Sequence, residues 1–162
     1  MATLVVLKFD TPDGAEKGLE LAQSLQKQQL LKVLDAVTVT WPMGKRRPKT
    51  RQVAHTVATS ALDGAFWGML LGFIFFVPVL GMAVGAAMGA IRGHFTDYGI
   101  DDSFIDQVRK KVTEGTSGLF LLLSDVTTDK VVDGFKSAPR FEIVSTNLSN
   151  EQEAKLREAF AE

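Results

Sequence analysis

The sequence contains no cysteine, and this absence removes several kinds of chemistry at once. Disulfide bonds, thiolate metal sites and thiol nucleophiles are all excluded. With only two histidines as well, the chain offers little from which to build a dedicated transition-metal site. Charge of neither sign is in excess, with 18 Lys and Arg against 19 Asp and Glu. This balance argues against a protein that binds nucleic acid through its overall charge.

The motifs of nucleotide-binding and hydrolytic enzymes are missing too. There is no G-x-x-x-x-G-K-[ST] loop, and the glycines from Gly81 to Gly89 lack the spacing and the strand-to-helix setting of a dinucleotide site. Ser60, Ser103 and Ser117 have no G-x-S-x-G setting and no convincing base. We therefore expect no enzyme activity, no catalytic residue and no cofactor.

One group of polar residues beside the central apolar region suggests a metal or proton site: His55, His94, Asp63, Asp97, Asp101 and Asp102. Helix capping accounts for the aspartates, and an interface position accounts for the histidines. We therefore expect no metal site.

The length of 162 residues fits one domain, or one domain with an insertion. The N-terminus, MATLVVLKFDTPDG, has no basic region and no small-residue cleavage site, and its apolar stretch is too short for a signal peptide. We expect the protein to be made and kept in the cytoplasm.

Regular periodicities at the start of the chain predict a β-α-β unit. Leu4–Phe9 is short, apolar and rich in β-branched residues, which is typical of a buried strand. Apolar residues at helical spacing follow from Ala15 to Gln29. The segment Val33–Trp41 then alternates between apolar and polar residues, as a second strand does.

The second half of the chain repeats this pattern. Asp101-Asp102-Ser103 predicts a helix start, and the continuous apolar run 118–123 predicts a strand covered on both faces. A short helix through Phe135, a strand over 140–146 and a closing helix from Ser149 follow. The fold class is therefore α+β. We expect a ferredoxin-like sheet from residues 1–52 and 97–162, in the order β-α-β, insertion, α-β-α-β-α, with residues 53–96 inserted as a glycine-zipper helical hairpin.

The insertion is defined by glycines within an uncharged stretch, residues 64–91, that exceeds the about 20 residues needed to cross a bilayer. Its glycines recur at intervals of four: Gly64, Gly68 and Gly72, then Gly81, Gly85, Gly89 and Gly93. Residues four apart share one helix face, so each half carries a groove without side chains. Glycine costs about 1 kcal/mol per helical position relative to alanine, which favours a second backbone packed into the groove.

Two helices joined near Pro78 fit this insertion better than one, because proline breaks a helix and the two glycine series differ in phase. The predicted tip comprises Phe73, Ile74, Phe75, Phe76 and Pro78. The first arm is about 21 Å long, less than the bilayer core of about 30 Å. The hairpin is therefore expected to span with polar ends, to enter one leaflet, or to be buried against other subunits. Burial within its own molecule is the least favoured alternative, because a small sheet is expected to lack surface for these aromatic residues and for Trp67.

Five basic residues precede the insertion: Lys45, Arg46, Arg47, Lys49 and Arg51. Beside an apolar hairpin they are typical of contact with anionic headgroups. A nucleic-acid patch and a plain solvated loop are the alternatives. Without interleaved aromatics, nucleic acid is disfavoured, whereas the solvated loop is as well supported as the headgroup contact.

The glycine hairpin, the segment Asp97-Tyr98-Gly99-Ile100-Asp101-Asp102-Ser103-Phe104-Ile105 and the strand GLFLLLSDV resemble a bacterial family known as domain of unknown function 1269. The resemblance covers nearly the whole chain. Members of this family are commonly described as predicted membrane proteins, so the resemblance implies membrane association and implies no activity.

The leading hypothesis is a non-enzymatic, homo-oligomeric protein on the cytoplasmic side of the inner membrane. Its glycine faces pair within and between subunits, and its partners are other copies of itself and membrane lipid. The alternative is a soluble cytoplasmic ring, shell or filament whose hairpins form a dry core, with a sheet edge as a second contact. A third hypothesis, a small-ligand sensor that uses the sheet face, requires a polar pocket.

Overall fold

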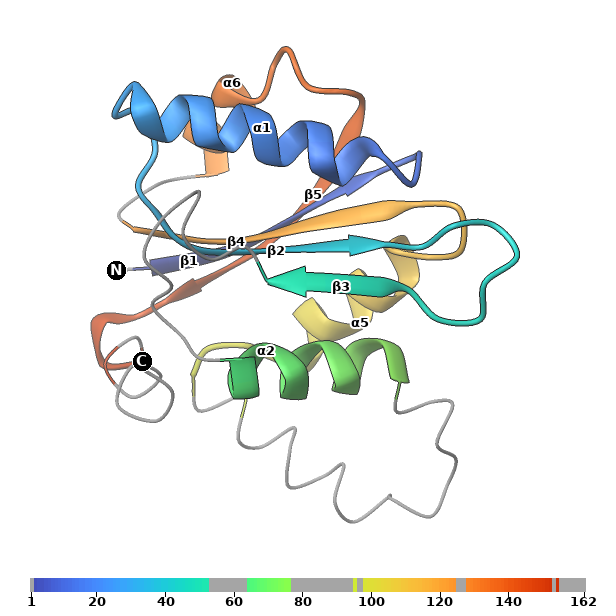
Figure 1. Cartoon of the computed structure of the whole chain (residues 1–162). Helices are drawn as coiled ribbons and strands as arrows, with labels where there is room; N and C mark the ends of the chain where they lie inside the picture. Colours follow the sequence, from blue (N-terminus) through green and yellow to red (C-terminus); the bar gives the residue numbers. More distant parts are fainter. Residues whose placement is uncertain are drawn as a thin grey trace.

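The computed structural model describes residues 2–52, 64–76, 95, 98–124, 128–152 and 154. These residues form a five-stranded sheet in the order β3-β2-β4-β1-β5, with every pair of neighbouring strands antiparallel. Helices lie on both faces of the sheet (Figure 1). The expected α+β class is confirmed.

The strands are β1 (Ala2–Phe9), β2 (Val33–Thr40), β3 (Lys49–Gln52), β4 (Ser117–Ser124) and β5 (Phe141–Leu148). The centre of the sheet is β4, which pairs with both β1 and β2 and is buried from Ser117 to Leu123. This burial on both faces agrees with its unbroken run of apolar residues. The edge strand β3 was not predicted, because its four residues carry no apolar alternation.

One face of the sheet is covered by α1 (Gly14–Lys27) and α6 (Thr128–Gly134). The other face is covered by α2 (Gly64–Leu71), the π-helical turn η1 (Gly72–Phe76) and α5 (Asp102–Lys111) (Figure 1). The strand period of two divides β1 between the two cores. Val5, Leu7 and Phe9 face α1, whereas Leu4 and Val6 face α2 and α5.

The ends of the helices follow local rules. Asp101 caps α5, since its side chain accepts a hydrogen bond from the backbone N–H of Phe104 at 2.9 Å. The closing helix, described only at residues 150–152 and 154, begins as expected after Ser149, whose backbone and hydroxyl form reciprocal hydrogen bonds with Gln152. Helix α1 ends two residues before the expected Gln29, which adopts a positive φ of 61°.

The expectation that the sheet lacks surface for the inserted aromatic residues is wrong. Its second face holds six side chains from α2 and η1, each no more than 6% exposed: Trp67, Leu70, Leu71, Phe73, Ile74 and Phe75. They share one apolar core with Leu4, Val37, Phe120 and Leu122 of the sheet. Apolar burial of this size therefore holds the first part of the insertion on the sheet.

Candidate packing site on the inserted helix

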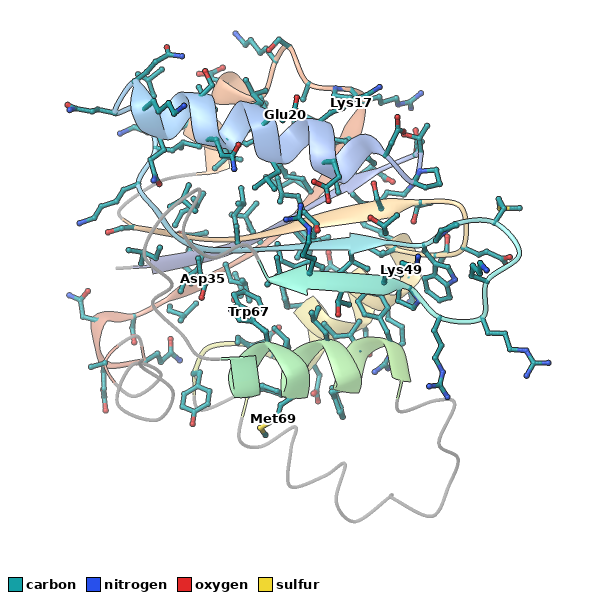
Figure 2. The ribbon with its side chains drawn as sticks, viewed as in Figure 1. Lys17, Glu20, Asp35, Lys49, Trp67 and Met69 are labelled. Atoms are coloured by element: carbon teal, nitrogen blue, oxygen red, sulfur yellow. The ribbon has the colours of Figure 1, made fainter. Side chains whose placement is uncertain are left out.

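Helix α2 turns its glycines away from the sheet. Gly68 is exposed and Gly72 is half-buried, and a Cβ atom added at either position meets no atom of the described residues within 4 Å. Met69 beside them is 39% exposed and points away from the sheet (Figure 2). Gly64 is the first residue of α2. The outward face of α2 and η1 at Gly68, Met69 and Gly72, called the glycine face below, is therefore smooth, uncharged and uncovered by the described part of the chain.

A buried hydrogen bond fixes the rotation of α2. The indole Nε1–H of Trp67 donates to Oδ2 of Asp35 at 3.0 Å, and the two side chains are 2% and 1% exposed. Asp35 lies in β2 where its register with β4 shifts, and its Oδ1 also accepts from the backbone N–H of Ala36 at 2.9 Å. With Trp67 held inward, Gly68 and Gly72 face outward. We did not single out Asp35 from the sequence, although a carboxylate within an apolar strand is the kind of signal that marks such a contact.

Arg109 of α5 holds the far end of this segment. Its Nε and Nη2 groups donate to the carbonyl oxygens of Ile74 at 3.0 Å and Phe73 at 2.9 Å, and its guanidinium lies 5.6 Å from the centroid of the Phe73 ring. Carbonyl groups at a helix end need partners of this kind. No local pattern in the sequence identifies this contact.

Four residues of the predicted tip, Phe73 to Phe76, lie in the described part of the chain. Phe73, Ile74 and Phe75 lie in the core below the sheet, and Phe76 ends η1. Pro78 and the second glycine series, Gly81, Gly85, Gly89 and Gly93, lie outside the described residues.

The five basic residues fall into two settings. Lys45, Arg46 and Arg47 are exposed in the turn between β2 and β3, and Lys49 is exposed at the start of β3. Arg51 instead forms an ion pair with Glu16 of α1, with Nη2–oxygen distances of 2.7 and 2.9 Å. The cationic surface is therefore the turn and the adjacent end of β3.

The described part of the chain gives little support to a metal site or to a ligand site on an open face of the sheet. Within it, no group of three or more His, Asp or Glu side chains is placed to hold a metal ion. His55, His94, Asp63 and Asp97 lie outside it. Because helices cover both faces of the sheet, the small-ligand sensor that would use an open sheet face gains no support.

No helix within residues 2–52, 64–76, 98–124 and 128–152 is long and apolar enough to cross a membrane.

The fold and the site define an α+β protein whose antiparallel sheet carries, on its second face, an inserted uncharged helix with an open glycine face. The chain belongs to the family described as "Protein of unknown function (DUF1269)", whose model matches residues 61–161. The resemblance found in the sequence is thereby confirmed. The matched range contains the insertion from residue 61 onward, together with α5, β4, α6 and β5. No curated protein and no solved structure matches the chain.

Proposed function

We propose that this protein is a non-enzymatic, homo-oligomeric protein that assembles through the glycine face of α2 and η1. The observation that carries the proposal is the outward position of Gly68 and Gly72, one helical turn apart, where no described residue covers them. The partner that fits this face is the corresponding face of a second copy, because two smooth helix surfaces allow their backbones to approach closely.

The energetics of glycine support this reading. Each glycine within a helix costs about 1 kcal/mol relative to alanine. Packing on the sheet does not require these two, because a Cβ atom at Gly68 or Gly72 would meet no described residue within 4 Å. Close contact with a second helix backbone would offset the cost of these two glycines. We extend the proposal to the second series, Gly81 to Gly93, as the other half of the zipper.

The strand order supports a finer description of the fold. We propose a ferredoxin-like sheet in the order β2-β4-β1-β5, with β3 added at one edge and the hairpin inserted between β3 and β4. In this arrangement α1 connects β1 to β2, which run parallel on either side of β4. In the same way α6 connects β4 to β5, on either side of β1. Both helices lie on one face of the sheet.

Membrane association is the second candidate, on the cytoplasmic side of the inner membrane. The uncharged stretch of residues 64–91 and the uncharged outward face of α2 favour it. The contacts of Asp35 and Arg109 favour a form in which α2 stays on the sheet, whether the assembly is soluble or lipid-bound.

The test compares Gly68→Leu with Gly68→Ala in the full-length chain. Leucine fills the groove, so we expect the particle to become smaller, whereas alanine keeps a small residue and should leave its size unchanged. Light scattering after size exclusion, with and without detergent, measures the size, and circular dichroism checks the fold. A Gly68→Leu protein of wild-type size would refute the glycine-face contact.

Fractionation of the native protein separates the two forms of the proposal. A protein that stays in the pellet through salt and alkaline carbonate washes, and leaves it only in detergent, is embedded in lipid. A large, uniform particle that needs no detergent supports the soluble assembly and contradicts the membrane candidate.

A further inference from the structure

We propose that the turn between β2 and β3 is a docking surface for anionic lipid headgroups. In this docked state Met43 enters the boundary of the acyl chains, and Lys45, Arg46 and Arg47 contact the headgroups. The inference rests on the proposed membrane association, and it does not depend on self-assembly through the glycine face.

The turn presents an apolar tip beside a run of cations. Met43 is 74% exposed, the most exposed of the large hydrophobic side chains in the described part of the chain. Lys45, Arg46 and Arg47 follow it directly and are all exposed. An apolar residue combined with adjacent basic residues is what binds a protein to the surface of an anionic bilayer, because the two contributions add.

The turn is held in place by the rest of the domain. Trp41 at its base exchanges backbone hydrogen bonds with the turn that precedes β4, accepting from Gly115 at 2.7 Å and donating to Thr116 at 3.0 Å. The indole Nε1–H of Trp41 donates to the carbonyl of Lys45 at 2.9 Å. Binding to a membrane would therefore need little further ordering of the turn, which favours affinity.

Few acidic groups oppose the cations. The backbone N–H of Gly44 donates to the carboxylate of Glu114, which is the acidic side chain that contacts the turn in the described part of the chain. Glu16 is already paired with Arg51 and lies on the α1 side. Within the described part of the chain, the exposed cations Lys45, Arg46 and Lys49 therefore outnumber this one carboxylate.

The position of the turn matches that of the uncharged stretch. The Trp41 ring meets the Phe75 ring edge-on, with 6.1 Å between centroids. Phe75 lies next to the end of η1, and in the sequence the uncharged stretch continues from there to residue 91. The turn and the end of η1 thus lie at the same end of the domain (Figure 1). A bilayer that receives the apolar segment would meet this turn at its surface.

Lipid fits this surface better than nucleic acid does. Binding of single strands relies on exposed aromatic rings that stack on bases. The aromatic ring at the base of the turn, Trp41, is half-buried against Phe75, and the exposed tip is the aliphatic Met43.

The experiment measures binding of the full-length protein to phosphatidylcholine vesicles with and without phosphatidylglycerol, by flotation at low and high salt. The test variant is Lys45→Gln/Arg46→Gln/Arg47→Gln. Its matched control is Lys17→Gln/Lys27→Gln/Lys136→Gln, which also removes three positive charges. These lie at exposed positions in α1 and after α6, on the opposite side of the sheet. Met43→Ser tests the apolar tip.

We expect wild type to float with anionic vesicles, to float poorly with neutral ones and to be released by salt. The test variant should bind about a hundredfold more weakly, since each basic residue near an anionic membrane contributes about 1 kcal/mol. The control should bind like wild type, and Met43→Ser should bind more weakly.

Three outcomes would overturn the proposal. The first is a wild-type protein that does not bind anionic vesicles, and the second is a test variant that binds as tightly as the control variant. The third is single-stranded RNA that binds the protein more tightly than the vesicles do and releases it from them. Circular dichroism confirms that each variant folds, and Lys45→Gln/Arg46→Gln serves as a milder second variant. The particle size of Gly68→Leu tests self-assembly in a separate experiment. Either proposal can therefore fail while the other is still tested.

Discussion

The side chains of Asp35 and Trp67 meet in a hydrogen bond of 3.0 Å beneath the sheet, where both are almost fully buried (Figure 2). Asp35 belongs to the β-α-β unit and Trp67 to the insertion, so this bond ties the two parts together. It also decides which side of α2 faces the sheet, and therefore which side presents its glycines outward.

Replacing Trp67 with phenylalanine should lower the free energy of unfolding by about 1–3 kcal/mol. The ring is largely retained, but the buried carboxyl group of Asp35 loses the hydrogen bond from the indole, and removing one partner of a buried hydrogen bond costs about that much. Urea unfolding measures the change. The matched control is Trp41→Phe, which removes an indole hydrogen bond to an exposed backbone carbonyl and should cost less. Equal costs for the two variants would contradict the anchoring role of Asp35.

The same glycine-to-alanine substitution should have opposite effects in two helices. In α1, a Cβ atom at Gly18 would lie 2.7 Å from Cζ of the fully buried Phe9, so Gly18→Ala should destabilise the fold by about 1–3 kcal/mol. In α2, the Cβ atom of Gly68→Ala would meet no described residue within 4 Å, so this substitution should stabilise the fold by up to about 1 kcal/mol. Thermal unfolding of both variants checks the signs. A clear loss of stability in Gly68→Ala would mean that the glycine face is already occupied within the molecule.

Arg109→Met should weaken the attachment of η1. The variant keeps the aliphatic stem but removes the donors to the carbonyls of Phe73 and Ile74, and we expect a loss of about 1–3 kcal/mol. Amide hydrogen exchange should become faster in residues 64–76 than in β1 or β4. Lys110→Met, at the exposed neighbouring position, should change stability by no more than about 0.5 kcal/mol. Unchanged exchange in Arg109→Met would show that apolar packing alone holds the segment.

Stability should fall in acid partly through Glu142. Hydrogen bonds from Lys111 and Lys8, together with their positive charges, hold the pKa of Glu142 below its ordinary value of 4.5. A lowered pKa in the folded state means that the unfolded chain binds more protons, so this contribution is present above pH 4.5 and is lost as the pH falls through the folded pKa.

Glu142→Gln should therefore flatten the dependence of the unfolding midpoint on pH between about pH 5 and about pH 3. Glu20→Gln, on the outer side of α1, is the control and should keep the wild-type slope. If the unfolding midpoints of both variants fell equally as the pH was lowered, Glu142 would not contribute to the pH dependence.

The sequence by itself determined the parts of this protein that depend on neighbours along the chain. Alternation and apolar runs identified β1, β2, β4 and β5, and helical spacing identified α1. Capping residues located the starts of two helices, at Asp101 and at Ser149. The uncharged stretch and its glycines at intervals of four were also visible directly, because each is a property of a single segment.

Tertiary structure alone decided where the inserted segment lies and which way it faces. The bonds that hold it join residues 32 to 36 positions apart, Asp35 to Trp67 and Arg109 to Ile74 and Phe73. The edge strand β3 likewise exists because β2 offers it an edge with which to pair. Helix α2 is apolar on all sides, so its composition could not show which side would be buried. The choice was made by the apolar second face of the sheet and by one buried carboxyl group, which together turn Trp67 inward and leave Gly68 and Gly72 outside.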